Sequence, residues 1–493
     1  MNYVSTRDSN VKLSSAQAIV RGLSADGGLF MPEGIPHITE KELEGLTDMD
    51  YRARAKLILS KFLTDYTDAE LESCVQGAYT AEKFGGDNPA PVKKLDDKNY
   101  VLELWHGPTC AFKDMALQIM PRLLTAAVKK DSSGKTIVIL VATSGDTGKA
   151  ALEGFCDVEG TRILVFYPAH GVSEVQKKQM TSQGGENTGV IGIEGNFDDC
   201  QNGVKLIFGD KAASSRLSDG GFEFSSANSI NWGRLVPQVV YYFSAYAELV
   251  KSCEIKIGDK LDFIVPTGNF GDILAGYIAK KMGLPVGRLV CASNKNNVLT
   301  DFINTGVYDK NRDFFTTSSP SMDILISSNL ERLLYIMSGY DDKKVSEYMR
   351  RLNTDGKYTV DADILEKIQS EFSAGFADEE KTKAAIGDAY SRFNYVIDPH
   401  TAVAYRVAAD YESNNKKVIL STASPYKFPA SVIEGLGGSA NVDNEFELFG
   451  ILRGKTGVPV PPQLAALENA VSRFNEKCEK TDMLDKVYKF LGL

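Results

Sequence analysis

The sequence predicts an α/β protein in which parallel sheets are flanked by helices, with a mostly helical N-terminal region. Continuous β-branched and apolar runs, such as TIVILVA at residues 136–142, are typical of strands buried on both faces. Three strand–turn–helix units follow one another over residues 135–208, which indicates parallel strands joined by right-handed crossovers. The helical N-terminal region is predicted by the periodicity of residues 40–82.

Length and turn residues predict how the chain is divided. At 493 residues it is too long for one small core, so we expect several domains. The proline-containing runs DNPAP and GVPVPP mark two boundaries. The expected units are an N-terminal domain at 1–88, a catalytic region of two α/β subdomains at 89–456 with a helical insertion at about 300–395, and a linker with helices at 457–493.

Composition argues against several classes of function. The formal net charge of −10 disfavours binding to nucleic acid or to an anionic membrane surface. No apolar window approaches the length of a membrane-spanning helix and no signal peptide is visible, so we expect a cytoplasmic protein. The seven cysteines contain no Cys-x-x-Cys pair and the four histidines no His-Glu-x-x-His motif, which predicts free thiols and no metal site.

Taken in order, the first part of the chain alternates short helices and turns. A serine pair is suited to cap a helix over residues 16–23, and an Asp-Gly-Gly turn precedes a short apolar run at 29–32. Residues 101–105 predict a strand, which the sequence HGPT interrupts. A helix is expected over residues 115–124.

The middle of the chain repeats strands and helices. Further strands are expected at residues 136–142, 161–167, 189–194, 261–265, 288–293 and 417–420. Helices are expected at residues 149–155, 173–183, 196–208 and 236–250, and directly after residue 272. A helical segment is expected to end the chain.

Lys113 lies where the strand and the helix around residue 110 meet, beside Cys110, Phe112 and Met115. The positive end of a helix dipole and partial desolvation both disfavour the ammonium form of an amine at such a place. A lysine of this kind can form a Schiff base with a carbonyl cofactor. The competing interpretation is a solvated lysine in a first helical turn.

A glycine loop follows the strand at residues 261–265 and precedes a helix; it consists of Gly268, Asn269, Phe270, Gly271 and Asp272. Glycines let the backbone approach a ligand, and the free amides of a helix N-terminus suit a phosphate. The loop has neither the P-loop pattern nor the dinucleotide fingerprint, so a phosphate on a non-nucleotide ligand fits better than ATP or NAD. The alternative is a glycine turn kept for packing.

Three other loops carry polar side chains at strand or helix ends. The loop with Ser144 and Thr147 is suited to hold a carboxylate or a second phosphate, or else only caps a helix. Thr422, at the carboxyl end of a strand, is suited to hydrogen-bond a neutral heterocycle nitrogen, or else forms a simple turn. Arg234, in the loop with Asn231, is suited to bind an oxyanion, or else is an ordinary surface arginine.

Together these features describe a site for pyridoxal 5′-phosphate. Lys113 supplies the Schiff base, the glycine loop binds the 5′-phosphate, and Thr422 meets the ring nitrogen. The conjunction is far less expected by chance than any one of its members.

Several motifs, in the same order along the chain, resemble the threonine synthase family of fold-type-II pyridoxal-phosphate enzymes. They are YVSTR at 3–7, HGPT and AFKD within 106–114, the segments 143–148, 226–234 and 268–272, SPSMDI at 319–324 and DPHTA at 398–402. The motif around Lys113 is highly specific, and the resemblance covers nearly the whole chain. The long form, with its elaborated 300–400 region, is similar to the bacterial and fungal class.

The resemblance implies the same cofactor roles for Lys113, the glycine loop and Thr422, with Lys113 also as the general base. It implies a lyase of threonine biosynthesis that converts O-phospho-L-homoserine and water into L-threonine and phosphate by γ-elimination and β-addition. The expected contacts of the substrate's carboxylate and phosphate are Ser144, Thr147, Asn231 and Arg234.

One position departs from the family, because Ser424 stands where the family commonly has histidine. This removes any role for a histidine there and leaves the Thr422 contact unaffected. Two other functions stay open: another fold-type-II lyase such as threonine or serine dehydratase, and a non-catalytic protein that binds a phosphorylated metabolite. The N-terminal motif and the insertion at 300–395 argue against the dehydratase. We expect a monomer or a homodimer.

Overall fold

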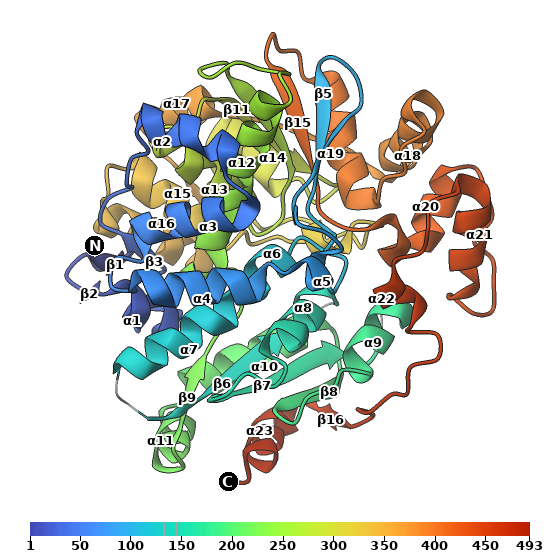
Figure 1. Cartoon of the computed structure of the whole chain (residues 1–493). Coiled ribbons are helices and arrows are strands. Elements are labelled where there is room, and N and C mark those ends of the chain that lie inside the picture. The colour runs from blue at the N-terminus through green and yellow to red at the C-terminus, as the bar shows by residue number, and fades with distance from the viewer. Residues whose placement is uncertain (132–133, 144, 171) are drawn as a thin grey trace.

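The computed structural model describes residues 1–131, 134–143, 145–170 and 172–493, and two sheets form its framework (Figure 1). The strands of the larger sheet, in spatial order, are β14 (Phe372–Phe376), β11 (Val286–Ser293), β10 (Leu261–Pro266), β15 (Lys416–Ser421), β5 (Asn99–Glu103) and β4 (Val92–Lys94). Those of the smaller sheet are β16 (Lys477–Glu479), β8 (Thr188–Glu194), β7 (Thr161–Pro168), β6 (Thr136–Ala142) and β9 (Phe222–Ser225). Neighbouring strands are parallel except β4 and β5, so the predicted α/β architecture is confirmed.

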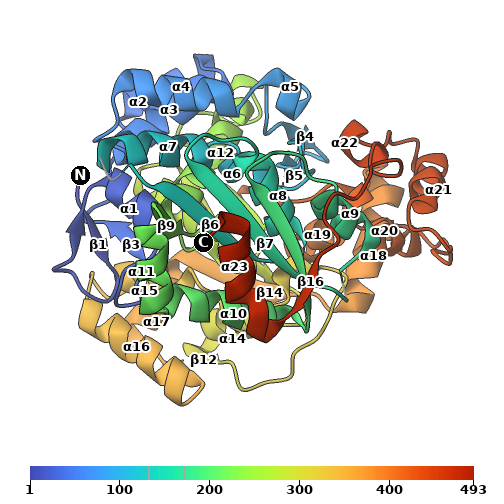
Figure 2. The same cartoon turned by 90° about the horizontal axis from the view of Figure 1, so that it is seen from below.

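Strand β6 is buried on both faces, as its continuous apolar run predicted. Ile137 and Ile139 enter the main core, which also contains the apolar residues of α8 (Asp146–Phe155). Val138 and Leu140 point to the opposite face, because successive side chains of a strand alternate. That face is covered by α10 (Phe197–Gly209), α11 (Lys211–Asp219) and α23 (Met483–Leu491), as seen from below in Figure 2.

The N-terminal region packs against one long buried helix, α12 (Trp232–Lys251). It contains a small antiparallel sheet of β1 (Tyr3–Ser5), β2 (Lys12–Leu13) and β3 (Phe30–Pro32). Its helices are α1 (Ser15–Arg21), α2 (Glu40–Gly45), η1 (Leu46–Asp48), α3 (Tyr51–Phe62), α4 (Asp68–Ala78) and α5 (Ala81–Phe84). The Tyr3 and Phe62 rings meet the Trp232 ring edge-on, at centroid distances of 5.5 and 5.6 Å, which fixes the region on α12.

The second half of the chain adds helices around the larger sheet. After β10 come α13 (Gly271–Lys281), α14 (Val298–Thr305), β12 (Val307–Asp309), η2 (Pro320–Met322), α15 (Leu330–Met337), α16 (Asp342–Thr354), β13 (Lys357–Thr359), α17 (Ala362–Glu371), α18 (Glu379–Phe393) and α19 (Pro399–Asp410). After β15 come η3 (Pro425–Lys427), α20 (Pro429–Gly435), α21 (Glu447–Thr456), α22 (Pro462–Ala465) and η4 (Lys480–Asp482). In Figure 1 this last part descends from the larger to the smaller sheet.

Two expected elements differ from the structure. The helix expected over residues 115–124 is two helices, α6 (Asp114–Leu117) and α7 (Met120–Asp131). Pro121 has no amide to donate to the Leu117 carbonyl, so the helix restarts there. Gly154 of α8 lies close to the Leu117 carbonyl, since a Cβ at Gly154 would lie 2.0 Å from the oxygen of that carbonyl. The second difference is the region at about 300–395, expected to be a helical insertion: it also contains β14, which pairs with β11 at the edge of the larger sheet. The sequence analysis also missed β4, β9 and β16, which pair with β5, β6 and β8.

The remaining helix on the smaller sheet, α9 (Glu174–Thr181), lies where a helix was expected over residues 173–183. Among the helices of the described residues, none combines the length and the apolar character that crossing a bilayer requires.

Candidate active site

The loops that follow β5, β6, β10 and β15 meet between the two sheets. They lie at the carboxyl ends of parallel strands, where open α/β sheets bind ligands. Helix α6 lies between the larger sheet above and the smaller sheet below in Figure 1. The loop before α6 carries Lys113, and hydrogen bonds and charge interactions join it to the other three loops.

Lys113 is a buried residue that precedes the first turn of α6. It is 8% exposed, which excludes the solvated lysine of the competing interpretation. Its Nζ lies 3.5 Å from the hydroxyl of Ser321 and 3.9 Å from Oδ2 of Asp146. Burial lowers the pKa of Lys113 to about 8; Asp146 opposes this, and the nearby cation of Arg234 adds to it. The neutral amine is therefore far more populated at physiological pH than in an ordinary lysine, although the ammonium form still predominates.

The Ser321 hydroxyl near Lys113 is positioned by residues that the sequence analysis quoted but gave no role. The imidazole Nε2 of His400 accepts a hydrogen bond from the Ser321 amide at 3.2 Å. The other ring nitrogen of His400 pairs with Asp398 at 2.7 Å. Both side chains are buried, so they fix the segment that faces Lys113.

The glycine loop presents unused amides. The amides of Gly268, Asn269 and Phe270 donate to no group within the described residues. The carbonyls of Gly268 and Asn269 are occupied instead, by the Ser327 hydroxyl at 2.8 Å and the Asn329 amide at 3.0 Å. Phe270 has a φ of 64°, a left-handed conformation that a bulky residue rarely adopts. The loop is therefore held from its carbonyl side, with its amides left for an anion.

Gly268 and Asp272 constrain the two ends of this loop. A Cβ at Gly268 would lie 2.7 Å from the carbonyl oxygen of Ser321, so only glycine fits. One oxygen of Asp272 accepts hydrogen bonds from the hydroxyls of Tyr241 at 2.5 Å and Tyr242 at 2.9 Å, and the other oxygen has no partner among the described residues. Burial raises the pKa of Asp272 to about 6, although the two tyrosines oppose the shift.

Thr422 is tied by its backbone to the loop that carries Lys113. Its carbonyl accepts the Phe112 amide at 2.8 Å, and Ala423 bridges to Ala111. The buried Thr422 hydroxyl has no hydrogen-bond partner within the part of the chain that the structure describes. It is therefore free to meet a ligand atom, as the sequence analysis expected.

Arg234 is buried, so it is not an ordinary surface arginine. One of its terminal nitrogens donates to the carbonyl of Ala227 at 2.7 Å, and its Nε has no partner among the described residues. Burial lowers the pKa of Arg234 to about 10, so it stays charged at neutral pH. A buried cation with an unused donor is suited to bind an anion, and that role of Arg234 stays a prediction.

The other expected substrate contacts are Thr147, Ser144 and Asn231, and they differ in their position. Thr147 lies half-buried in the first turn of α8, whereas Ser144 lies outside the described residues. Asn231 caps α12: its amide nitrogen donates to the carbonyls of Ile19 and Ser226, both at 2.9 Å. Both amide hydrogens of Asn231 are thus used inside the protein, and its geometry is that of a residue that holds the loop.

Sequence reasoning gave no role to Lys427, which is fully buried and pairs with Asp146 at 2.8 Å. Both residues stand in loops that the sequence analysis singled out, but neither periodicity nor spacing signals that two distant loops share one ion pair. Ser424, the position that departs from the family, accepts the Tyr426 amide at 3.3 Å and caps η3.

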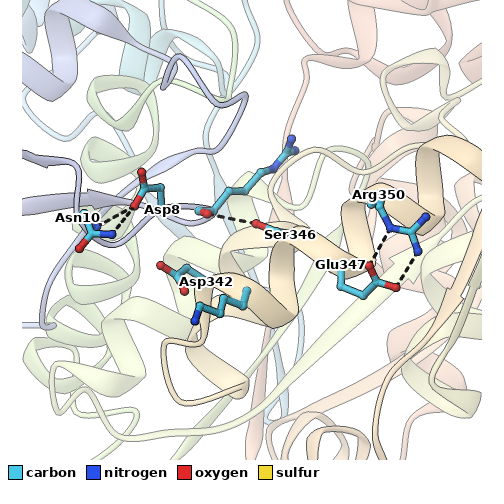
Figure 3. Close-up of a pocket in the computed structure, with 8 residues that line it drawn as sticks. Asp8, Asn10, Asp342, Ser346, Glu347 and Arg350 are labelled. Atoms are coloured by element: carbon cyan, nitrogen blue, oxygen red, sulfur yellow. Dashed lines mark hydrogen bonds and ion pairs between the residues drawn. The ribbon is translucent and has the colours of Figure 1, made fainter.

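A separate shallow pocket lies on the surface between the N-terminal strands and α16 (Figure 3). Several of its polar groups are engaged by the protein: Glu347 binds Arg350 through two hydrogen bonds of 2.8 Å, and Asp342 accepts the Ser9 amide. The lining includes none of the residues around Lys113. Among the described residues, no cluster of His, Cys, Asp and Glu has the arrangement of a metal site.

Three family descriptions match successive parts of the chain. Residues 2–79 match "Threonine synthase N terminus", residues 87–423 match "Pyridoxal-phosphate dependent enzyme", and residues 401–488 match "Threonine synthase, C-terminal". Together they extend over most of the sequence, in the order in which the motifs were found.

Individual proteins show the same similarity. The chain is 41% identical over 453 residues to human threonine synthase-like 1, which covers 88% of this chain but 60% of that longer protein. It is 37% identical over 485 residues to a threonine synthase of Pseudomonas aeruginosa, covering 97% of this chain and 99% of the relative. The crystal structure of a PLP-bound threonine synthase from Brucella melitensis superposes with a TM-score of 0.89, at 38% identity and with full coverage of both chains.

Proposed function

The chain belongs to the threonine synthase family of pyridoxal-phosphate-dependent enzymes, and we propose that it converts O-phospho-L-homoserine and water into L-threonine and phosphate. The observation that carries this proposal is the position of one amine. Lys113 is buried, its pKa is lowered to about 8, and it stands among an amide cradle, a free hydroxyl and a buried arginine.

The residues present fit pyridoxal phosphate. The unused amides of Gly268, Asn269 and Phe270 suit its phosphate, and Gly271 and Asp272 complete that loop. The unpartnered hydroxyl of Thr422 suits its ring nitrogen. Lys113 is the lysine that would bind its aldehyde.

When bound, pyridoxal phosphate supplies an electron sink next to the substrate's amine-bearing carbon. The chain's own residues then have separate tasks. Lys113 Nζ is the base that we assign to proton transfer at Cα and Cβ of the substrate, and its lowered pKa makes the unprotonated form more available near neutral pH than in an ordinary lysine. The uncharged Thr422 hydroxyl, rather than a carboxylate, would meet the ring nitrogen of the bound cofactor, so Thr422 would contribute no negative charge that draws a proton onto that nitrogen.

We assign the anionic ends of the substrate to the opposite side of the site. Arg234 has the buried charge and the unused donor that bind a carboxylate or a phosphate. Thr147, in the first turn of α8, is a proposed further contact, since the free amides of a helix start suit an anion. Ser144, which lies outside the described residues, is proposed as a contact from its place in the sequence alone. Asn231 supports this set by holding the loop that leads into α12.

Further parts of the proposal concern the setting of the enzyme. The acidic net charge supports a protein that binds neither nucleic acid nor an anionic membrane surface. The cysteines are unpaired in the structure, which supports a reducing, cytoplasmic location. We also propose that residues 1–88, 89–456 and 457–493 are the units of the chain, acting as a monomer or a homodimer.

A direct assay tests the proposed function. The purified chain, reconstituted with pyridoxal phosphate, is incubated with O-phospho-L-homoserine, and released phosphate and L-threonine are measured together. We expect equal amounts of both. Release of 2-oxobutyrate from added L-threonine, without phosphate release from phosphohomoserine, would identify a dehydratase instead. A chain that binds phosphohomoserine but takes up no cofactor would be a binding protein.

A further inference from the structure

Two buried lysines from different loops face one carboxylate. Lys113 precedes α6, Lys427 ends the η3 turn after β15, and Asp146 begins α8 after β6. The Nζ of Lys427 lies 2.8 Å from Oδ1 of Asp146, and the Nζ of Lys113 lies 3.9 Å from Oδ2. The side chains of all three residues are almost completely buried, so their charges interact with little screening.

Lys427 is saturated by the protein. An ammonium group has three hydrogens to donate. Lys427 has three acceptors: Oδ1 of Asp146 at 2.8 Å, Oε1 of Gln179 at 2.6 Å and the carbonyl of Thr109 at 3.2 Å. No hydrogen is left for a substrate, so Lys427 acts through its charge and through the groups that it holds.

Within the described residues, the Asp146 carboxylate accepts hydrogen bonds through one oxygen only. Its Oδ1 accepts from Lys427 and also from the amide of Gln176 at 2.9 Å. Its Oδ2 faces Lys113 at a distance longer than a hydrogen bond. The carboxylate is therefore held just short of a full ion pair with Lys113.

We propose that Lys427 is a positioning residue for Lys113: by holding Asp146 through Oδ1, it prevents that carboxylate from closing onto Lys113 and so keeps the Lys113 amine available. This inference rests on the proposed role of Lys113 in binding pyridoxal phosphate. It assigns a second lysine to the site and gives the aspartate of the loop after β6 a role in setting the charge of Lys113.

The charges around Lys113 give the sign of the effect. They are Asp146 on α8, Arg234 on α12, Lys427 in η3, the neighbouring Asp114 on α6, and Asp272 on α13, whose pKa the Lys113 cation lowers. After burial, which lowers the pKa of Lys113 most, Asp146 raises it and Lys427 lowers it. Replacing Lys427 removes a repelling cation and also frees Asp146 to approach, and both changes favour protonated Lys113. Replacing Asp146 has the opposite effect.

The test measures the Lys113 amine in the full chain stripped of pyridoxal phosphate. Lys113 is reductively methylated with formaldehyde and cyanoborohydride at a series of pH values, and its peptide is quantified by mass spectrometry against that of Lys489, whose side chain is 70% exposed. The variants are Lys427→Met, Lys427→Arg, Asp146→Asn and the double variant Asp146→Asn with Lys427→Met. The pH dependence of the visible absorbance of the reconstituted variants is a second readout.

We expect the two single variants to shift the pH midpoint of Lys113 reactivity in opposite directions, and these shifts to cancel in the double variant. The midpoint of Lys113 reactivity moves up by about one unit in Lys427→Met and down by about one unit in Asp146→Asn. It returns to within about half a unit of wild type in the double variant, which removes one charge of each sign. Lys427→Arg, which keeps the cation, stays near wild type.

A merely structural role predicts otherwise, because loss of packing would impair both single variants alike and the double variant most. Equal midpoints in wild type and Lys427→Met, or shifts of the same sign in both single variants, would overturn the inference. The control is Lys416→Met at the other end of β15, where Lys416 pairs with Glu254 at 3.1 Å; its midpoint stays at the wild-type value. A chain inactive on phosphohomoserine that still shows the cancelling shifts would refute only the proposed function.

Discussion

The loops of the two sheets use their polar groups in opposite ways. After β10 and β15 of the larger sheet, the amides of Gly268, Asn269 and Phe270 and the hydroxyl of Thr422 have no partner among the described residues. After β6 of the smaller sheet, two side chains are instead engaged by the protein itself: Thr143 accepts two amides, and Oδ1 of Asp146 accepts from Lys427 and Gln176.

The difference indicates that the two sets of loops have different tasks. Free donors arranged by the fold are suited to a group that stays in the site, because they lose little on binding it. Engaged groups cannot donate to a ligand without breaking contacts, so they act on charge and shape. On our proposal, the loops after β10 and β15 would hold the cofactor, and Asp146 after β6, held by Lys427, would adjust the amine that reacts. Each prediction below tests one side of this comparison.

The largest effect is expected at the amine between the two sides. Lys113→Ala should lower kcat by at least about 1,000-fold, because it removes the base and the covalent attachment of the cofactor together. The stability of the chain should change little, since the substitution removes the desolvation cost of a buried amine whose nearest polar partners lie at 3.5 and 3.9 Å. Phosphate release and thermal unfolding are measured on the same preparation. Activity near wild type would refute the assigned role.

A second prediction displaces the glycine loop of the larger sheet without removing any of its backbone amide donors. Gly268→Ala places a Cβ 2.7 Å from the Ser321 carbonyl, so the loop has to move away from it. A displacement of this kind should weaken cofactor binding and turnover by about 100-fold. Equilibrium titration with pyridoxal phosphate measures the affinity. Gly450→Ala, where a Cβ meets nothing within 4 Å, is the matched control and should bind the cofactor normally.

The fold was more predictable than the site, for a physical reason. Strand β6 begins and ends where its apolar run does, and the glycine loop and Lys113 lie at the predicted strand and helix ends. Local sequence determines these features. The strand β16 is short and half-exposed, so only its pairing with β8 defines it.

Partnerships across the chain could not be predicted in the same way. Lys427 and Asp146 are 281 positions apart in the sequence, and burial of both is a property of the folded chain. The same holds for Asn231, whose residue type suited a substrate contact but whose amide is used by Ile19 and Ser226. Residue type and local position predict which groups are polar, and tertiary contacts decide which remain free.

Asp272, on the larger-sheet side, lowers the stability of the folded chain when its buried carboxyl ionises, and the pH dependence of unfolding measures this effect. Because burial raises its pKa to about 6 from an ordinary value near 4, the folded chain binds this proton more tightly than the unfolded chain. The stabilisation that comes from this tighter proton binding is fully present below about pH 4 and is lost as the pH rises to about 6.

Asp272→Asn removes this pH-dependent loss of stability, because an amide side chain does not ionise. The free energy of unfolding of the cofactor-free variant, relative to wild type, should rise by about 2 kcal/mol between pH 4 and pH 7. Urea unfolding at several pH values measures the difference, which separates Asp272 from Asp114, a second buried carboxyl whose pKa is raised. A difference that does not change with pH would contradict the raised pKa of Asp272.

The smallest effects come from a matched pair of substitutions that removes one hydroxyl from each side. Thr143→Val leaves the amides of Gly145 and Gly148 without their acceptor, so it should lower the free energy of unfolding by about 1 kcal/mol. Thr422→Val removes a hydroxyl that bonds nothing in the described protein, so unfolding should change by less than about 0.5 kcal/mol. Cofactor affinity should instead fall about fivefold in Thr422→Val, the value of one neutral hydrogen bond. Urea unfolding of the cofactor-free variants and titration with pyridoxal phosphate together distinguish these outcomes. If both variants lost stability equally, the two sheets would not differ in how they use their polar groups.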